Sequence, residues 1–550
     1  MPMDPILPAS RVQAMKQQGF WPDRLLLDDL DRWAAEAPER VAVVDHNSMT
    51  GERTALTYAE LLDRVDRLAN GMIRLGIRKG DVVSFQLPNW WQFQALHLAA
   101  LRVGAVTNPI MPIFRERELR FMLRHAGTKL MVIPQSFRNF DYPAMLGALR
   151  ADLPELRHVL AIGGAGESEF SRLLEHAPDR AARAVFTANR PHPDDVALLL
   201  YTSGTTGEPK GVMHTSNTLS AMVRPFAARF SLGEVDVMMM ASPLAHLTGF
   251  GYGLVMPVHM GGRAVYQDIW NAQAAVDLVR DEGVTFTMGA TPFVSDLADA
   301  ATGRRADVQT LRGFLSAGAP IPRTLVRRAT DVLGAFIISA WGMTENGAAT
   351  STKPGDPPER IFETDGCPFP GLEVRAVDAA GKILPPDREG RLQIRGAANF
   401  VGYMGHPEWY ATDEEGWFET GDLARVDADS YVRITGRSKD VIIRGGENVP
   451  VVEVEGLIYQ HPAIAECAVV AMPDPRLGER GCAFVTLRAG QTIDFSELVA
   501  FLREKGLTRS YLPERLEVVE AMPKTPSGKI QKVVLRDIAR NFLPVGRAGT

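Results

Sequence analysis

The stretch that decides the fold reads LYTSGTTGEPKG and covers residues 200–211. It continues an apolar run, VALLL at residues 196–200, which is typical of a buried strand. Glycine residues let backbone N–H groups approach an anion closely, small hydroxyl residues add donors, and Lys210 supplies a mobile positive charge. The stretch therefore predicts a strand followed by a phosphate-binding loop, and ATP is the ligand that fits it best.

This loop differs from a Walker A motif, which needs Gly, four residues and then Gly-Lys-Ser or Gly-Lys-Thr. Here Gly207 is followed by Glu208 and Pro209 before Lys210. The spacing therefore disfavours a P-loop kinase. A flexible surface loop rich in small residues is the alternative interpretation, and the preceding strand and the lysine favour phosphate binding over it.

The composition limits the classes of protein to which the chain can belong. It has 550 residues, of which 45% are hydrophobic and 23% charged, with a formal net charge of −6. The length predicts several folding units fused into two bodies, and the negative charge argues against bulk nucleic-acid binding. Cys367, Cys467 and Cys482 form no CxxC pair, so we expect neither a zinc site nor a disulfide framework, and a reducing cytoplasm is the natural compartment.

We expect neither a secretory nor a peroxisomal targeting signal. The N-terminus lacks the basic-then-apolar layout of a secretory signal, and the C-terminus lacks a peroxisomal tripeptide. Residues 237–262 contain no Asp, Glu, Lys or Arg, but prolines and glycines interrupt them. Such a kinked apolar segment more often lines a protein cavity than crosses a membrane. We expect a cytoplasmic protein with no membrane association.

Strand-like and helix-like runs alternate over the first four hundred residues, which predicts an α/β body with mostly parallel sheets. The expected strands are at residues 41–44, 82–87, 131–133, 159–162, 264–266, 286–288 and 336–338, and the expected helices include 57–75 and 96–106. We divide the body, residues 1–436, into two α/β subdomains, about 1–193 and 194–373, and a small β unit, 374–436. A polar run at 437–440 then precedes a small α+β C-terminal domain, 437–550.

Three further motifs carry residues suited to chemistry. WGMTE at residues 341–345 follows a predicted strand, so its aromatic side chain could stack on a base and its carboxylate could hold Mg²⁺; a capped turn is the alternative. TGD at 420–422 places an acid where it could accept both ribose hydroxyls, or where it only stabilises its own turn. PKTPSGK at 523–529 puts Lys529 on a loop stiffened by prolines, whereas most terminal lysines are only solvated.

In this order the motifs resemble those of the adenylate-forming superfamily, which contains acyl- and aryl-CoA synthetases, luciferases and the adenylation domains of peptide synthetases. The resemblance spans about residues 30–540 and rests on 202–211, 341–345, 420–422, 436–455 and 523–529. Within the superfamily the chain is most similar to bacterial CoA ligases of the cyclohexanecarboxylate type.

The resemblance implies a set of nucleotide-binding residues. The β- and γ-phosphates would be enclosed by Thr202, Ser203, Gly204, Thr205, Thr206 and Gly207, with Lys210 nearby. The adenine would be flanked by Gly318, Ala319 and Pro320, with Trp341 and Gly342 at its face, and the ribose would be held by Asp422 and Arg437. The family usually has tyrosine where this chain has Trp341; tryptophan keeps the stacking face but loses the hydroxyl.

The resemblance also implies catalytic and mobile residues. Thr344 would touch the α-phosphate, Glu345 would bind magnesium, and Lys529 would bridge the substrate carboxylate and the α-phosphate. In the family the small C-terminal domain rotates between two half-reactions; Lys439, within the hinge at 437–440, would be its pivot. Gly445 and Gly446 would then face the acyl adenylate, where only bare backbone fits. A mobile Lys529 is also a plausible target for a protein acetyltransferase and a deacylase, because acetylation removes its charge.

The acid pocket is less well defined by the sequence. We expect its walls at Leu247, Phe250, Met288, Gly289 and Ala290. His246 would lie at the mouth and gate the carboxylate; a structural histidine bonded to backbone is the alternative. Residues 237–262 offer no acid to pair with the ammonium group of an amino acid, so an uncharged hydrophobic acid is favoured: cyclic, aromatic or medium-chain, and most of all cyclohexanecarboxylate-like.

The predicted activity is that of an acyl-CoA synthetase that forms AMP and pyrophosphate, with ATP, Mg²⁺ and coenzyme A as cofactors or co-substrates. The alternatives are an aryl-acid AMP ligase that loads a separate carrier protein, and a nucleotide-binding regulator with an inactive site. Intact Lys210, Glu345 and Lys529 argue against the regulator. We expect a small-molecule carboxylic acid as the main partner and a monomer or homodimer as the assembly.

Overall fold

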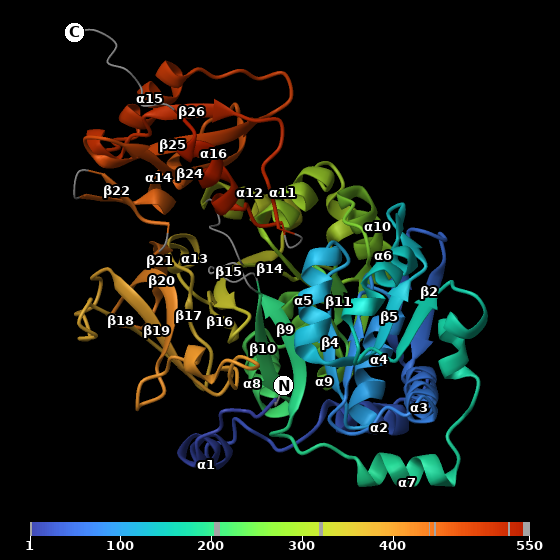
Figure 1. Cartoon of the computed structure of the whole chain (residues 1–550). Coiled ribbons are helices and arrows are strands. Elements are labelled where there is room, and N and C mark those ends of the chain that lie inside the picture. Colours follow the sequence, from blue (N-terminus) through green and yellow to red (C-terminus); the bar gives the residue numbers. More distant parts are fainter. Residues whose placement is uncertain are drawn as a thin grey trace.

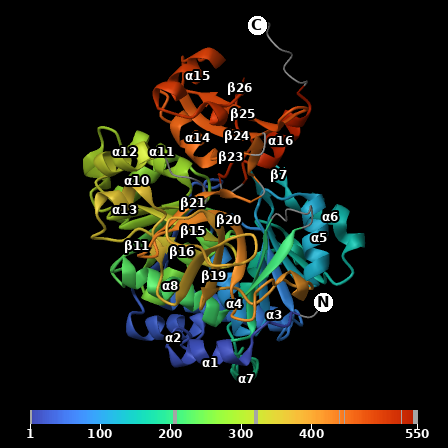
Figure 2. The same cartoon turned by 90° about the vertical axis from the view of Figure 1, so that its left-hand side faces the viewer.

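The computed structural model describes residues 3–202, 209–317, 323–438, 440–444, 447–525 and 528–542. Figure 1 shows a large body of stacked sheets and helices with a smaller C-terminal domain at one end. Figure 2 shows the same domain over the strands β20 (Phe418–Val426) and β21 (Val432–Arg437) and beside the helices α11 (Thr291–Ala300) and α12 (Arg323–Leu333). This arrangement confirms the predicted α/β body followed by a small α+β domain.

The first sheet of the body has six strands in the order β10-β9-β4-β3-β5-β8. Its strands are β3 (Val82–Phe85), β4 (Val106–Pro109), β5 (Thr128–Pro134), β8 (His158–Ile162), β9 (Val196–Thr202) and β10 (Lys210–Thr215). All neighbours run parallel except β9 and β10, which are antiparallel. Residue Thr202 lies opposite Lys210 in that pair, so residues 203–208 connect two antiparallel strands, unlike the strand-to-helix loop of a Walker A site.

The second sheet has nine strands in the order β17-β16-β15-β14-β13-β11-β12-β1-β2. Its strands are β1 (Val41–His46), β2 (Arg53–Thr57), β11 (Val237–Met240), β12 (Arg263–Gln267), β13 (Phe286–Gly289), β14 (Gly313–Ala317), β15 (Phe336–Met343), β16 (Gly347–Ser351) and β17 (Cys367–Pro368). The run from β1 to β15 is parallel, with antiparallel strands at both edges. The expected break near residue 193 is not a boundary between sheets: β1 and β2 belong to this sheet, while β9 and β10 belong to the first.

Helices pack around these sheets, and the start of α3 (Tyr58–Arg74) shows how a local sequence signal defines a helix. The helices are α1 (Ala9–Gln17), α2 (Leu26–Glu36), α3 (Tyr58–Arg74), α4 (Trp91–Arg102), α5 (Glu116–Ala126), α6 (Tyr142–Leu149), α7 (Arg180–Ala188), α8 (Ser216–Arg229), α9 (Met256–Met260), α10 (Ala272–Glu282), α11 (Thr291–Ala300), α12 (Arg323–Leu333) and α13 (Pro358–Glu363). In α3 the hydroxyl of Thr57 accepts from the N–H of Glu60, and the carboxylate of Glu60 accepts from the N–H of Thr57, so the start is fixed by a capping box. By contrast, α4 begins and ends earlier than the expected 96–106. It cannot extend to residue 106, because Val106 already belongs to β4.

The largest apolar cluster joins the two sheets through α3, α4, α8 and the segment η4 (Thr248–Val255). That segment is a π-helix that continues into α9, a rare conformation that often occurs at functional sites. It belongs to the apolar stretch 237–262, which forms short buried elements here. Among the described residues, we find no helix with the length and apolarity needed to cross a membrane.

The remaining strands form two smaller sheets. The β unit is an antiparallel sheet of β18 (Leu372–Val377), β19 (Gly390–Gly396), β20 (Phe418–Val426) and β21 (Val432–Arg437). The C-terminal domain contains β22 (Ile442–Arg444), β23 (Glu447–Val449), β24 (Ile464–Asp474), β25 (Gly478–Leu487), β26 (Arg515–Val518), α14 (Val451–Ile458), α15 (Phe495–Glu504) and α16 (Lys532–Arg540). Its two apolar clusters consist of residues after 441, so this domain has a core of its own. That core supports the proposed boundary at residue 437.

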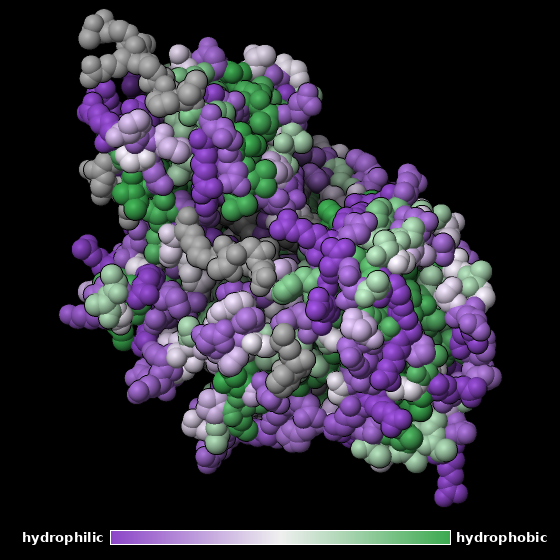
Figure 3. Space-filling model, viewed as in Figure 1, coloured by the Kyte–Doolittle hydropathy of each residue, from purple (hydrophilic) through white to green (hydrophobic). Residues whose placement is uncertain are grey.

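Figure 3 shows hydrophilic and hydrophobic residues interspersed over the visible face of both parts.

Candidate active site

The candidate site lies where the body, the β unit and the C-terminal domain meet, at the carboxyl ends of parallel strands, where α/β sheets commonly bind ligands. Trp341 and Gly342 lie inside β15 and not after it, as the sequence analysis expected. Gly342 has no room for a side chain, because an added Cβ would lie 1.9 Å from the carbonyl oxygen of Gly347 in the neighbouring strand. Thr344 and Glu345 follow in the connection to β16.

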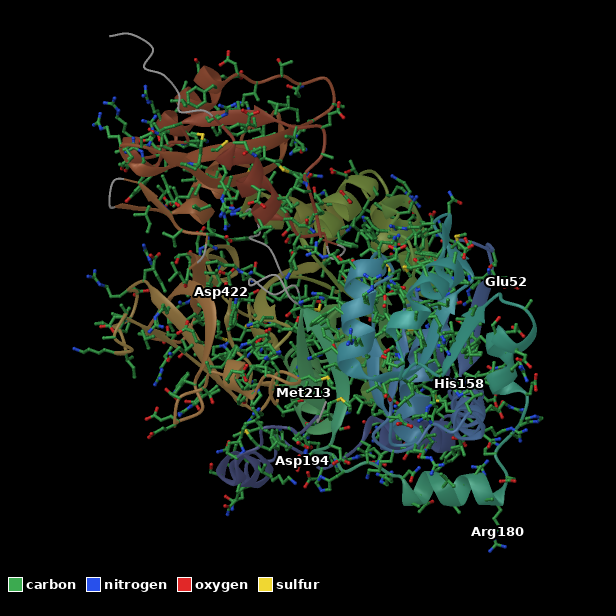
Figure 4. All side chains as sticks on the ribbon, in the orientation of Figure 1. Glu52, His158, Arg180, Asp194, Met213 and Asp422 are labelled. Carbon is green, nitrogen blue, oxygen red and sulfur yellow. The ribbon has the colours of Figure 1, made fainter. Side chains whose placement is uncertain are left out.

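Asp422 lies in a β-bulge and not at a free turn. Gly421 in the middle of β20 has φ +78°, a left-handed conformation that favours glycine, and the pairing of β20 with its neighbours shifts at this point. The hydroxyl of Thr420 accepts from the N–H of Asp422 at 3.1 Å and donates to the carbonyl of Leu392 at 2.7 Å. Thr420 therefore stabilises the bulge, which leaves the carboxylate of Asp422 available for other partners. Figure 4 shows Asp422 at the end of the β unit nearest the C-terminal domain.

Two side chains donate to that carboxylate. The indole Nε1 of Trp341 lies 2.8 Å from Oδ2 of Asp422, and Nε of Arg437 lies 3.0 Å from Oδ1. Arg437 reaches it because it lies directly opposite Asp422 in the β20–β21 pair. Burial raises the pKa of Asp422, while the Arg437 charge and both hydrogen bonds act in the opposite direction.

Glu345 is held by residues that the sequence analysis did not include. The hydroxyl of Tyr403 donates to Oε1 of Glu345 at 2.7 Å, and the ammonium of Lys210 lies 4.9 Å from the ring centres of both Tyr403 and Trp409. Burial raises the pKa of Glu345, and the hydrogen bond from Tyr403 and the charge of Lys210 oppose that shift. Lys210 is thus held by cation–π contacts beside a buried acid.

The backbone of Thr344 has a buried partner, His214. Its Nε2 lies 2.8 Å from the carbonyl oxygen of Thr344. Burial lowers the pKa of His214 to about 4, so the ring is neutral at neutral pH and can donate from Nε2. This bond fixes the position of the connection that carries Thr344 and Glu345.

The C-terminal loop brings Lys529 into this group. A built Cβ on Gly528 would lie 3.5 Å from Cε2 of Phe293 and 3.9 Å from Cβ of Ala290, so the loop contacts the body. Burial and, to a smaller extent, the charge of Arg437 lower the pKa of the half-buried Lys529 to about 8, against the opposing effect of Asp422 and Glu345. The C-terminal loop therefore places Lys529 where the charges of Asp422 and Glu345 act on it.

The loop is also anchored from within its own domain. Lys524 forms an ion pair with Glu466 at 2.6 Å. The N–H of Lys529 donates to Oγ1 of Thr525, whose own N–H donates to the carbonyl of Lys529. The position of Lys529 therefore follows that of the C-terminal domain.

His246 makes the backbone contact of a structural histidine, and its role as a gate stays a prediction. The backbone N–H of Thr248 donates to its Nδ1 at 3.2 Å, as expected of a structural histidine. Burial, helped by the charge of Lys529, lowers the pKa of His246 to about 3. The ring is therefore neutral and carries its proton on Nε2.

The residues expected to line the acid pocket are all buried, and they lie in different surroundings. Ala290 lies beside the C-terminal loop, as its distance to Gly528 shows. Phe250 is fully buried and packs edge-on against His97, with ring centres 4.7 Å apart. The others are Leu247, Met288 and Gly289.

Several predicted site residues lie outside the described residues, and their places stay predictions. They are Ser203, Gly204, Thr205, Thr206, Gly207, Gly318, Ala319, Pro320, Lys439, Gly445 and Gly446.

Comparison with known families agrees with this geometry. The AMP-binding enzyme family matches residues 30–404, and the AMP-binding enzyme C-terminal domain matches residues 453–529. The chain belongs to the adenylate-forming superfamily of AMP-binding enzymes. Within this superfamily the chain is an ATP-dependent acid–thiol ligase that acts on an acyl or aryl acid through an acyl adenylate.

Individual relatives cover nearly the whole chain. A medium-chain fatty-acid–CoA ligase of Escherichia coli (strain K12) is 40% identical over 97% of this chain and 94% of its own length. A salicylyl-CoA synthase / salicylate adenylyltransferase of a Streptomyces species is 35% identical over 97% of both chains. The crystal structure of an anthranilate CoA ligase in complex with anthranoyl-AMP superposes with a TM-score of 0.84, at 25% identity over 94% of this chain and 98% of that chain.

Proposed function

We propose that the chain is a carboxylic acid–CoA ligase that converts a hydrophobic carboxylate, ATP and coenzyme A into an acyl-CoA, AMP and pyrophosphate. The observation that carries the proposal is the contact of the C-terminal loop with the body: Gly528, next to Lys529, lies against Phe293 and Ala290, and the charges of Asp422 and Glu345 act on Lys529. A movable cation next to a ribose-binding acid and a metal-binding acid is what adenylate formation requires.

In the first half-reaction a carboxylate oxygen attacks the α-phosphorus of ATP. The bond from that phosphorus to the oxygen bridging to the β-phosphate breaks, and pyrophosphate leaves. Two unit charges about 4 Å apart repel by about 4 kcal/mol at an effective dielectric constant near 20. Protonated Lys529 offsets this repulsion and stabilises the charge that moves onto phosphate.

His246 and Lys210 have supporting roles. The neutral His246 ring carries a proton on Nε2, so it can donate to an oxygen of the incoming carboxylate without adding charge. Lys210, held over the rings of Tyr403 and Trp409, would pair with the β- and γ-phosphates.

Glu345 is the described residue that would hold Mg²⁺. The fit is chemical: the ion prefers carboxylate oxygens, and Glu345 is a buried acid whose Oε1 is already oriented by Tyr403. When bound, the ion supplies positive charge that neutralises the phosphates.

In the second half-reaction the thiol sulfur of coenzyme A attacks the acyl carbon, and AMP leaves with the electrons of the broken C–O bond. Lys529 occupies the site of the first reaction, so the second needs the C-terminal domain to move. We propose a hinge at 437–440 with Lys439 as pivot, which would bring Gly445 and Gly446 to the adenylate. Lys439→Pro is expected to slow thioester formation more than adenylation; equal survival of both rates would place the hinge elsewhere.

The acid is proposed from the pocket and the relatives together. The candidate walls, such as Leu247, Phe250 and Met288, are apolar and buried, which suits an uncharged hydrophobic tail. The 40%-identical relative is named for medium-chain fatty acids, which favours that part of the predicted range. Cyclohexanecarboxylate remains a proposed substrate, and aryl acids follow from the salicylate relative.

Two experiments test the function. Acid-dependent ATP–pyrophosphate exchange with octanoate, cyclohexanecarboxylate and salicylate is expected to proceed fastest with one of the first two. Coenzyme A should then accept the acyl group; exclusive transfer to a phosphopantetheinylated carrier protein would favour the aryl-acid AMP ligase. No exchange with any acid would favour an inactive nucleotide-binding regulator.

Regulation of Lys529 by acetylation is a separate proposal. The side chain is half-buried when the loop contacts the body, so an acetyltransferase would need the domain rotated away. Acetylation would remove the charge that the first half-reaction uses. Chemically acetylated enzyme is expected to regain exchange activity after treatment with a deacylase, and no recovery would count against this regulation.

A further inference from the structure

Trp341 makes one contact that base stacking does not need. Its indole N–H donates to Oδ2 of Asp422 at 2.8 Å, across 81 positions of sequence. Both residues are buried, with 8% of Trp341 and 4% of Asp422 exposed. Water therefore has little access to replace this bond.

The carboxylate of Asp422 can accept more hydrogen bonds than the two that Trp341 and Arg437 donate. An ionised carboxylate has two oxygens with about four acceptor sites. Among the described residues, Trp341 uses one on Oδ2 and Arg437 one on Oδ1, which leaves each oxygen a site for a further donor. Two adjacent oxygens with one open site each match a pair of neighbouring hydroxyl groups.

The bond also fixes which way the carboxylate faces. Arg437 alone would leave Asp422 free to rotate toward a fork-like pairing with both guanidinium arms, which is the usual geometry of such pairs. A donor on the opposite oxygen resists that rotation. Because the N–H group lies at the edge of the indole, the bond does not involve the ring faces and is compatible with base stacking.

From these contacts we propose that Trp341 is a positioning residue that holds Asp422 in the orientation that binds the ribose hydroxyls, so that one side chain couples recognition of the base to recognition of the sugar. This inference rests on the proposed function, in which Asp422 receives the ribose. It also accounts for tryptophan here: phenylalanine would keep a stacking face but would lose the donor.

The test compares Trp341→Phe with the wild type on two nucleotides. The readout is the ratio of kcat/KM for ATP to kcat/KM for 2′-deoxy-ATP in pyrophosphate exchange. The wild type is expected to prefer ATP by at least about tenfold, as expected when a buried acceptor loses its hydroxyl donor. Trp341→Phe should lower kcat/KM for ATP by about 10-fold or more but should affect 2′-deoxy-ATP much less, so the ratio falls at least about fivefold.

A matched control separates this effect from the loss of a buried tryptophan. Trp90 is also buried and donates to a carboxylate other than Asp422, that of Asp268, at 2.9 Å. Trp90→Phe is expected to leave the nucleotide ratio unchanged. Equal losses on both nucleotides in Trp341→Phe would overturn the inference, because a residue that only stacks or packs would affect them alike.

A second measurement keeps the inference testable should Trp341→Phe fold poorly. The indole N–H resonance of Trp341 in ¹⁵N-labelled protein, assigned by its loss in Trp341→Phe or in a milder Trp341→His variant, should shift in Asp422→Asn. An unchanged resonance would show that the bond is absent in solution. Exchange activity with ATP but no preference over 2′-deoxy-ATP in the wild type would overturn the coupling, whereas no exchange at all would overturn the proposed function.

Discussion

The nucleotide side and the acid side of the candidate site are built in different ways. On the nucleotide side, buried acids each have named donors: Trp341 and Arg437 for Asp422, and Tyr403 for Glu345. On the acid side, the ring of Phe250 packs within the apolar cluster, edge-on against His97. Polar partners fix geometry one bond at a time, whereas an apolar wall can change shape while its chemistry stays the same. The first side is therefore expected to be sensitive to single atoms, and the second to volume.

The largest expected effect comes from the cation that reaches the nucleotide side. Lys529→Ala is expected to slow adenylation by about 10²–10³-fold or more, because the charge developing on phosphate loses its partner. Thioester formation from added acyl adenylate should stay near the wild-type rate, since Lys529 moves away for that step. Measuring both half-reactions separately checks this, and an equal loss in both would contradict the role of Lys529.

A smaller effect is expected from removing the hydroxyl of Tyr403, which donates to Glu345. Tyr403→Phe keeps the ring that holds Lys210 but removes the O–H that donates to Glu345 at 2.7 Å. A hydrogen bond to a charged group contributes about 1.5–3 kcal/mol, so kcat/KM for ATP in pyrophosphate exchange should fall about 10–100-fold. Tyr142→Phe, which removes a hydroxyl bonded to the carbonyl of Pro112, is the matched control. Similar losses in both variants would assign the effect to stability.

The pH dependence follows from the lowered pKa of Lys529, which lies at about 8 in place of 10.5. The loop in solvent binds a proton more tightly than the loop against the body, so rising pH favours the contact but removes the charge that adenylation uses. We expect kcat/KM for exchange to fall about tenfold per unit above a midpoint near pH 8, because this parameter reports the free enzyme. A decline that begins only above pH 10 would show that Lys529 stays solvated.

A substitution on the acid side of the site should give the smallest change in activity. It should alter the preference among acids and not the binding of ATP. Phe250→Leu is expected to alter the ratio of kcat/KM for octanoate to that for cyclohexanecarboxylate by about 3–10-fold, since pockets discriminate by volume. The KM for ATP should stay within about twofold. Phe186→Leu in α7, another buried phenylalanine, is the control for general loss of packing. A change in KM for ATP that exceeds the change in acid preference would remove the distinction between the two sides.

Much of this arrangement could be predicted from the sequence. The parts that could not be predicted are those for which the local sequence carries no signal. Regular periodicity predicted α3 to within a residue, because Thr57 and Glu60 cap it locally. The expected start of the next helix at 96 was wrong: α4 begins at Trp91, where no side chain of the N-cap residue makes a capping bond. Local signals thus set the quality of local predictions.

Long-range partners gave no signal along the chain. Trp341 was predicted to lie near the nucleotide, but its bond to Asp422 spans 81 positions and that of Tyr403 to Glu345 spans 58. Likewise, the pairing of β1 with β12 mixes the two expected subdomains. Only the folded sheets bring such residues together.

The central claim is that the C-terminal loop and the body converge on one nucleotide and then separate. Gly528 and Ala290 allow a direct test, because their Cβ positions lie 3.9 Å apart, close to the mean of about 3.8 Å in disulfides. Cysteine at Gly528, where φ is +84°, is expected to cost about 1–2 kcal/mol. Native Cys367, Cys467 and Cys482 are buried, so mild oxidation should act on the new pair.

The measurement is the rate of each half-reaction in Ala290→Cys/Gly528→Cys, oxidised and reduced, with Gly528→Cys alone as the control. The oxidised enzyme is expected to keep adenylation and to lose thioester formation at least about tenfold, because the loop can no longer leave. Reduction should restore the second step. Failure of the cysteines to cross-link, or thioester formation at the same rate with the cross-link in place, would contradict the account.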